Sequence, residues 1–150
     1  MVICHIRRYL TKNCFWWLSL AYAIGVLLVT VFLRESKETV VFNVDISKGY
    51  LGGMKTEIAR QDTFKNVLAF IPLGILVCFA CKRYSVVIAL LLGLFLSETV
   101  ECLQAIFKKG IFDVNDLLAN TLGVVVGCAV YLLIMILIKS RRSASSRERQ

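Results

Sequence analysis

The chain has 150 residues, a length that fits one domain, and 58% of them are hydrophobic. Soluble domains contain about 45–50% apolar residues, so this surplus excludes an ordinary soluble protein. The formal net charge of +8 would suggest nucleic-acid binding in a soluble chain. Here the basic residues flank long apolar blocks, which indicates a membrane protein that contacts lipids and binds no nucleic acid.

Four apolar blocks are long enough to cross a bilayer as helices, since a crossing needs about 20 residues. The predicted spans cover residues 14–33, 62–81, 84–106 and 116–138. The first block follows Arg7 and Arg8 as a signal peptide would, but it is too long and lacks a small-x-small cleavage site. The gaps between the last three spans are short, so these spans must run antiparallel. The sequence therefore predicts an all-α membrane protein whose transmembrane domain, residues 14–138, is an antiparallel four-helix bundle.

The distribution of Lys and Arg predicts that both termini face the cytoplasm. In that orientation ten basic residues lie inside, crowded at the ends of the spans, and eight lie outside. Residues 1–13 then form a cytoplasmic N-terminus, and residues 34–61 form an outer loop. Within this loop, residues 40–46 are predicted to be extended. Residues 55–65, which continue past the end of the loop, are predicted to form a helix on the membrane surface. Residues 139–150 predict a basic, disordered cytoplasmic tail that binds anionic lipid.

The six cysteines do not indicate a disulfide framework, because none lies in the two polar loops placed outside. Their positions are typical of small buried apolar residues. Cys78 and Cys81, with Cys4 and His5, have the residue types of a zinc site, but the cysteine pair lies inside an apolar run. His5 is the only histidine, so a Ser/His or Cys/His catalytic set outside the membrane is excluded.

Rows of small residues mark packed faces on the third and fourth spans, since small residues let membrane helices approach closely. We expect these two rows to face each other. They consist of Ala89, Gly93 and Ser97 in the third span and of Ala119, Gly123 and Gly127 in the fourth.

Acidic and amide side chains share these faces, near the predicted outer ends of the helices. Glu101 would lie about 8 Å inside the third span, where a carboxylate costs several kcal/mol unless it is paired or protonated. An intramembrane acid of this kind indicates a functional site. The predicted binding residues are Asn66, Glu101, Gln104, Asp113, Asp116 and Asn120.

Structural roles compete with this interpretation for some members of the cluster. Asp113 and Asp116 could cap the fourth helix and complement its dipole. Gln104 and Asn120 could form hydrogen bonds that hold neighbouring helices together. No cofactor is expected, although the carboxylates could hold Mg²⁺ or Mn²⁺. Glu98 lies at the edge of the polar face, next to Ser97.

Three linked motifs lie within residues 62–133. Residues 66–74 read N-x-x-x-F-I-P-x-G, residues 97–104 read S-x-x-x-E-x-x-Q, and residues 113–123 read D-x-x-D-x-x-x-N-T-x-G. Their order and spacing resemble the VanZ-like family. Many members carry an arginine where this chain has Gly110, so a guanidinium fixed beside the acids is not expected here. The resemblance implies a multi-pass bacterial inner-membrane protein in a family linked to teicoplanin resistance, with no established reaction.

Two mechanisms follow from the resemblance and the polar cluster. In the first, a non-enzymatic membrane factor binds a lipid-linked wall precursor or a lipoglycopeptide at the outer leaflet and lowers susceptibility to glycopeptides. In the second, an intramembrane enzyme acts on a lipid-linked substrate, with Glu101 as general base and Glu98 or Asp116 as acid or metal ligand. A third hypothesis is that the protein moves ions or protons across the membrane. The inner halves of the predicted spans, however, carry no acidic residues that could form a proton relay.

Overall fold

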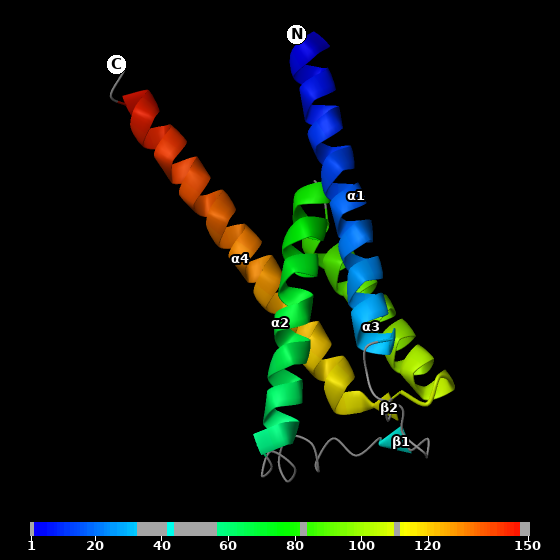
Figure 1. The fold of residues 1–150 in the computed structure, drawn as a ribbon. Coiled ribbons are helices and arrows are strands. Elements are labelled where there is room, and N and C mark those ends of the chain that lie inside the picture. Colours follow the sequence, from blue (N-terminus) through cyan, green and yellow to red (C-terminus); the bar gives the residue numbers. More distant parts are fainter. Residues whose placement is uncertain (1, 33–41, 44–56, 82–83, 110–111, 148–150) are drawn as a thin grey trace.

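The computed structural model describes residues 2–32, 42–43, 57–81, 84–109 and 112–147 (Figure 1). Four long helices account for almost all of this part of the chain. They are α1 (Val2–Phe32), α2 (Glu57–Ala80), α3 (Ser85–Ile106) and α4 (Val114–Arg147). Two short strands, β1 (Phe42–Asn43) and β2 (Phe112–Asp113), pair in parallel.

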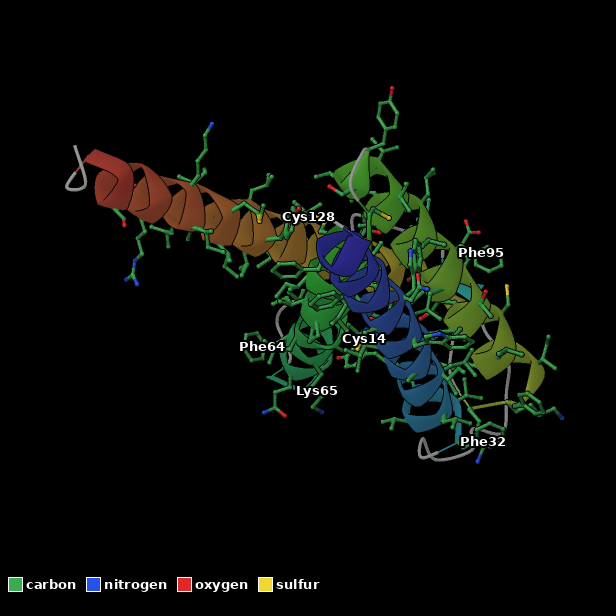
Figure 2. The ribbon with its side chains drawn as sticks, turned by 90° about the horizontal axis from the view of Figure 1, so that it is seen from above. Cys14, Phe32, Phe64, Lys65, Phe95 and Cys128 are labelled. Carbon is green, nitrogen blue, oxygen red and sulfur yellow. The ribbon has the colours of Figure 1, made fainter. Side chains whose placement is uncertain are left out.

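Each helix is long and apolar enough to span a membrane, which confirms the predicted all-α membrane protein. The apolar stretches are Asn13–Phe32, Thr63–Ala80, Ser85–Ile106 and Val114–Arg141. Large apolar side chains point outward from the helices, and Figure 2 shows Phe64 on α2 and Phe95 on α3 in this position. Phe95 is 69% exposed. An apolar exterior of this extent would aggregate in water and fits hydrocarbon as the solvent.

Helix α2 contacts all three other helices and packs most extensively against α4. Figure 1 shows α4 crossing α2 with its first half and diverging from the bundle with its second half. The start of α1 and the end of α4 lie at one end of the molecule, and the β1–β2 pair lies at the other. The polar residues described below belong to the β1–β2 end. Which end faces the cytoplasm stays a prediction.

Glycines bring the backbones of α2 and α4 into direct contact. A Cβ atom added at Gly123 would lie 2.3 Å from the carbonyl oxygen of Val67, and one at Gly127 would lie 2.3 Å from that of Ile71. From the opposite side, a Cβ atom at Gly74 would lie 2.5 Å from the carbonyl oxygen of Val124. Real Cβ atoms do not approach this closely, so only glycine permits the crossing.

The small-residue row of α4 therefore faces α2, not α3 as expected. The row of α3 meets a side chain instead, because a Cβ atom at Gly93 would lie 2.5 Å from a methyl group of Val124. Small residues reveal that a helix face is packed, but they do not reveal which neighbour packs there.

Pro72 lies inside α2, where its missing N–H group leaves a carbonyl of the preceding turn without its helical partner. The hydroxyl of Tyr22 on α1 donates a hydrogen bond to the carbonyl oxygen of Ala69 at 2.9 Å. The carbonyl that lacks the proline N–H is that of Leu68, so Tyr22 bonds the next carbonyl of the same turn and ties α1 to α2 beside the proline without replacing the missing donor.

Helices extend beyond several of the predicted spans. Helix α2 begins at Glu57, so the surface helix predicted over residues 55–65 is, where described, the continuous start of α2. Helix α4 continues to Arg147, and the predicted disorder of the tail is wrong up to that residue. The segment contains no Gly or Pro to stop the helix, and basic residues near a C-terminus favour the helix dipole. The extended run predicted over residues 40–46 is described only at Phe42 and Asn43, which form β1.

The described cysteines form no disulfide and lie in two different environments. Cys78 and Cys128 are buried, with their sulfur atoms 3.5 Å apart across the α2–α4 contact. Cys81 is also buried, whereas Cys14 and Cys102 are exposed. The expectation of burial therefore fails for these last two.

The α2–α4 contact predicts that Gly123→Ala destabilises the protein by about 1–3 kcal/mol, because the new methyl group meets backbone that cannot move aside. Thermal unfolding of the purified protein in detergent micelles measures the change. Gly25→Ala is the matched control, since nothing lies within 4 Å of a Cβ atom there. Equal losses in both variants would contradict the proposed contact.

Candidate functional site

Glu101 is the most deeply buried acid among the described residues, with 1% of its surface exposed. It lies near the end of α3, and its Oε2 atom accepts a hydrogen bond from the backbone N–H of Asp113 at 3.1 Å. Asp113 belongs to β2, directly before α4. One carboxylate thus joins the end of α3 to the start of α4, and its burial is compensated by a donor at that junction.

Asp113 caps α4. Its Oδ1 atom accepts hydrogen bonds from the backbone N–H of Asn115 at 2.9 Å and from the Nδ2 atom of Asn115 at 2.7 Å. This is the position and partner of an N-cap residue, which satisfies one of the unbonded N–H groups of the first turn. Asp116 is half-buried in the same turn, where an acid complements the helix dipole. Both aspartates therefore have a structural role at this helix start.

A second link between α3 and α4 lies one turn deeper. The Nδ2 atom of Asn120 donates to the Oγ atom of Ser97 at 2.8 Å, and both residues are buried. Ser97 precedes Glu101 by four residues, so the two links lie about 6 Å apart along α3. Asn120 and Ser97 form a polar contact between helices that are otherwise apolar at this level.

Two oxygen atoms of the cluster have no hydrogen-bond partner within the described part of the chain. They are the Oδ1 atoms of Asn115 and Asn120. Asn115 is 7% exposed and Asn120 is 3% exposed, and the amide groups of both already donate to Asp113 and Ser97. A buried acceptor without a donor is costly, so these atoms mark positions where a ligand or water would be stabilised.

Gln104 connects the cluster to α1. Its Nε2 atom donates to the carbonyl oxygen of Thr30 at 3.1 Å, in the last turn of α1, where carbonyl groups lack helical partners. The rings of Phe32 and Phe107 lie 6.0 Å apart at the same level. The ends of α1 and α3 are thereby held together beside Glu101.

The turn after α3 adopts an uncommon backbone conformation. Lys108 has a φ of 54°, and hydrogen bonds run from Lys108 N to the carbonyl of Ala105 and from Lys109 N to the carbonyl of Gln104. This is a Schellman motif, in which glycine normally occupies the left-handed position. The tight turn lets the chain reach β2 within a few residues, and β2 carries Asp113 to Glu101.

Two predicted site residues stand apart from this cluster. Glu98 is exposed on α3, so the same helix presents one buried and one exposed glutamate. Asn66 is half-buried on α2, and its side chain makes no hydrogen bond within the described part of the chain. Conversely, Asn115 belongs to the cluster although it is not among the predicted binding residues, and its position two residues after a capping aspartate was the available signal.

Metal ligation receives no support from the described side chains, among which no three His, Cys, Asp or Glu residues are grouped to hold an ion. The side chains of Cys4 and His5, named with Cys78 and Cys81 as zinc ligands, lie outside the described residues.

The residues of the cluster coincide with the three motifs found in the sequence, and the family comparison agrees with them. A family model described as VanZ/LLP1 matches residues 17–137. The chain belongs to the VanZ/LLP1 family. Its matched region contains all four apolar stretches in full or in large part, together with every residue of the cluster.

Similarity to an individual member of the VanZ/LLP1 family is partial. The chain is 34% identical over 71 residues to a protein named Protein VanZ from Enterococcus faecium. This match covers 47% of the chain and 44% of that relative, so less than half of the relative's length is represented. No solved structure matches the chain significantly.

The capping role of Asp113 in this VanZ/LLP1 protein can be tested through stability alone. We predict that Asp113→Ala lowers stability by about 1 kcal/mol, because the first turn of α4 loses its acceptor. Asp113→Asn keeps an acceptor oxygen and is expected to retain stability. Thermal unfolding in micelles compares the two variants, and an equally large loss in Asp113→Asn would contradict the capping role.

Proposed function

We propose that this VanZ-like membrane protein lowers the susceptibility of bacteria to glycopeptide antibiotics such as teicoplanin by binding an envelope component at its polar cluster. The observation that carries the proposal is Glu101, a carboxylate buried among helices and bonded to the start of α4. A carboxylate at such a position costs several kcal/mol, and a neutral glutamine could accept the same hydrogen bond, so the link to α4 does not by itself explain the charged group. Family membership and the similarity to Protein VanZ support the resistance role.

The proposal requires the cluster to face the outer leaflet, where glycopeptides meet lipid-linked wall precursor. Both termini would then lie in the cytoplasm, and the turn containing Lys108 would lie outside. Membrane lipids and a lipid-linked wall precursor or the lipoglycopeptide itself are the proposed partners. Binding would reduce access of the drug to its target without any covalent step.

Orientation can be measured with a pair of Lys→Cys substitutions at exposed residues on opposite ends of the molecule, Lys108 and Lys139. We expect a membrane-impermeant maleimide to label Lys108→Cys in intact cells and Lys139→Cys only after permeabilisation. Labelling of the unsubstituted protein gives the background from its native cysteines. The opposite pattern would remove the outer-leaflet site from the proposal.

The role of the buried carboxylate can be tested in a susceptible Gram-positive host. We expect the wild-type protein to raise the inhibitory concentration of teicoplanin and Glu101→Gln to return it to the level of the empty vector. Glu98→Gln is the matched control, because it makes the same change three residues away on an exposed face of α3. Immunoblots of membrane fractions establish equal amounts of each protein. Full protection by Glu101→Gln would contradict the proposal.

The alternative is an intramembrane enzyme that acts on a lipid-linked substrate, with Glu101 as general base. The observation that favours it is the buried Glu101 carboxylate at a helix start that also carries Asp113 and Asp116. Release of a product from lipid-linked wall precursor by the purified protein, lost in Glu101→Gln, would favour the enzyme over the binding factor.

A further inference from the structure

Glu98 is an exposed acid on an otherwise apolar part of the molecular surface. Within the interiors of the four apolar stretches, every other exposed side chain of the described residues is apolar, aromatic or a cysteine. The remaining exposed charges of the described residues lie near or beyond the ends of these stretches, and they are Lys65, Lys108, Lys139 and Arg141. Glu98 therefore stands alone as a charged type of side chain that faces outward in the middle of a span.

The depth of Glu98 calls for a partner inside the membrane. It lies about 12 Å before Ile106 along α3, too far from the helix end for its short side chain to reach the headgroups. It makes no hydrogen bond or ion pair within the described part of the chain. Acids in membrane spans almost always face the bundle interior or pair with another group. Since one copy of the chain offers neither here, the partner must come from outside it.

The residues around Glu98 form a face suited to packing against another helix. Leu91, Phe95, Glu98 and Cys102 are all exposed, and their spacing of four, three and four residues places them on an arc of roughly 60°. Figure 2 shows Phe95 pointing away from the other helices. This is the spacing of the seam in left-handed pairs of helices, in which a single polar residue fixes the register. We call these four residues the Glu98 face.

A second copy of the chain fits this face better than another partner. Copies of one membrane protein cross the bilayer in the same direction, so a two-fold axis along the membrane normal places Glu98 of each copy at one depth. A carboxyl group in hydrocarbon costs least when it is neutral and hydrogen-bonded. A neutral carboxyl group has an O–H donor and a free acceptor, so two of them satisfy each other.

We propose that α3 packs in parallel against α3 of a second copy through the Glu98 face, with the two Glu98 carboxyl groups hydrogen-bonded to each other. A salt bridge between copies is excluded at this depth for the described residues, because their basic side chains lie near or beyond the ends of the spans. Glu101 lies on a different, buried face of α3, so the contact does not depend on the proposed function.

Cys102 reports on the contact, since it lies one turn after Glu98 on the same exposed face. Membranes that contain the full chain are treated with copper phenanthroline, in which Cu²⁺ takes two electrons from two thiols as their protons leave and a disulfide forms. We expect a dimer on non-reducing gels that disappears in Cys102→Ser. Cys14→Ser is the matched control, because Cys14 is exposed on α1, and it should retain the dimer. Loss of the dimer in Cys14→Ser alone would overturn the proposal.

Substitutions of Glu98 measure the energy of the contact without a cross-link. Sedimentation equilibrium in density-matched micelles gives the dissociation constant of the dimer. We expect Glu98→Leu to weaken the dimer about tenfold, because the hydrogen bonds between the copies are lost. Glu98→Gln should keep the dimer, since an amide is also both donor and acceptor. Because Glu98 is exposed, both variants should unfold at the temperature of the wild-type monomer or above it.

Two results would contradict the proposal. Equal association of Glu98→Leu and the wild-type protein would show that Glu98 does not join two copies. An equal loss in Glu98→Leu and Glu98→Gln would show that the negative charge is required, which indicates a basic residue of a different membrane protein as the partner. Since Glu98→Gln is expected to keep the dimer, it serves as the control for Glu101→Gln in either case.

Discussion

Burial of the Glu101 carboxylate is the constraint around which one end of the bundle is organised. A carboxylate inside an apolar assembly must find donors, and the N–H of Asp113 provides one at 3.1 Å. To bring that N–H to α3, the chain turns sharply after Phe107 through a left-handed lysine and forms β2. Asp113 then caps α4, so the hydrogen bond to Glu101 also fixes where α4 begins.

The glycine contact between α2 and α4 supports this arrangement from the opposite side. Gly123 touches α2 at Val67, and Asn120, one turn earlier on α4, bonds to Ser97 on α3. The start of α4 is thus held by backbone contact on one face and by a polar side chain on another. Since the glycine contact leaves no room for rotation of α4, it also sets the direction in which Asn120 points.

The sequence predicts the number of helices and most of their apolar extent, because hydropathy and length reflect the thickness of the bilayer. It does not predict where helices end outside the bilayer. Helix α4 continues past residue 138 to Arg147, since hydropathy says nothing of helical propensity in a polar segment. The predicted partner of the Gly123 row was likewise wrong, because small residues are compatible with any close neighbour.

Glu98 and Glu101 show how far a helical wheel predicts the site, since Glu101 is buried and Glu98 is exposed. Both are glutamates on one helix, and the helical wheel places Glu98 at the edge of the polar face. Which glutamate is buried depends on the path of α4, which is set by the glycines and by the turn at Lys108. Whether the side-chain oxygens of Asn115 and Asn120 have a donor also depends on the path of α4, so only the three-dimensional structure reveals that they lack one.

Several polar residues of the family motifs have structural roles in this protein, which leaves fewer of them as candidates for binding. Asp113 bonds the first turn of α4, and Asp116 lies where the helix dipole favours an acid, so helix formation accounts for both. Gln104 satisfies a terminal carbonyl of α1, which helix packing also accounts for. A neutral glutamine could make the hydrogen bond that links Glu101 to the start of α4, so this link does not explain a buried carboxylate, and capping and packing do not explain buried amide oxygens that lack donors. Glu101, Asn115 and Asn120 are therefore the residues that favour a ligand, and the aspartates hold the start of α4 beside them.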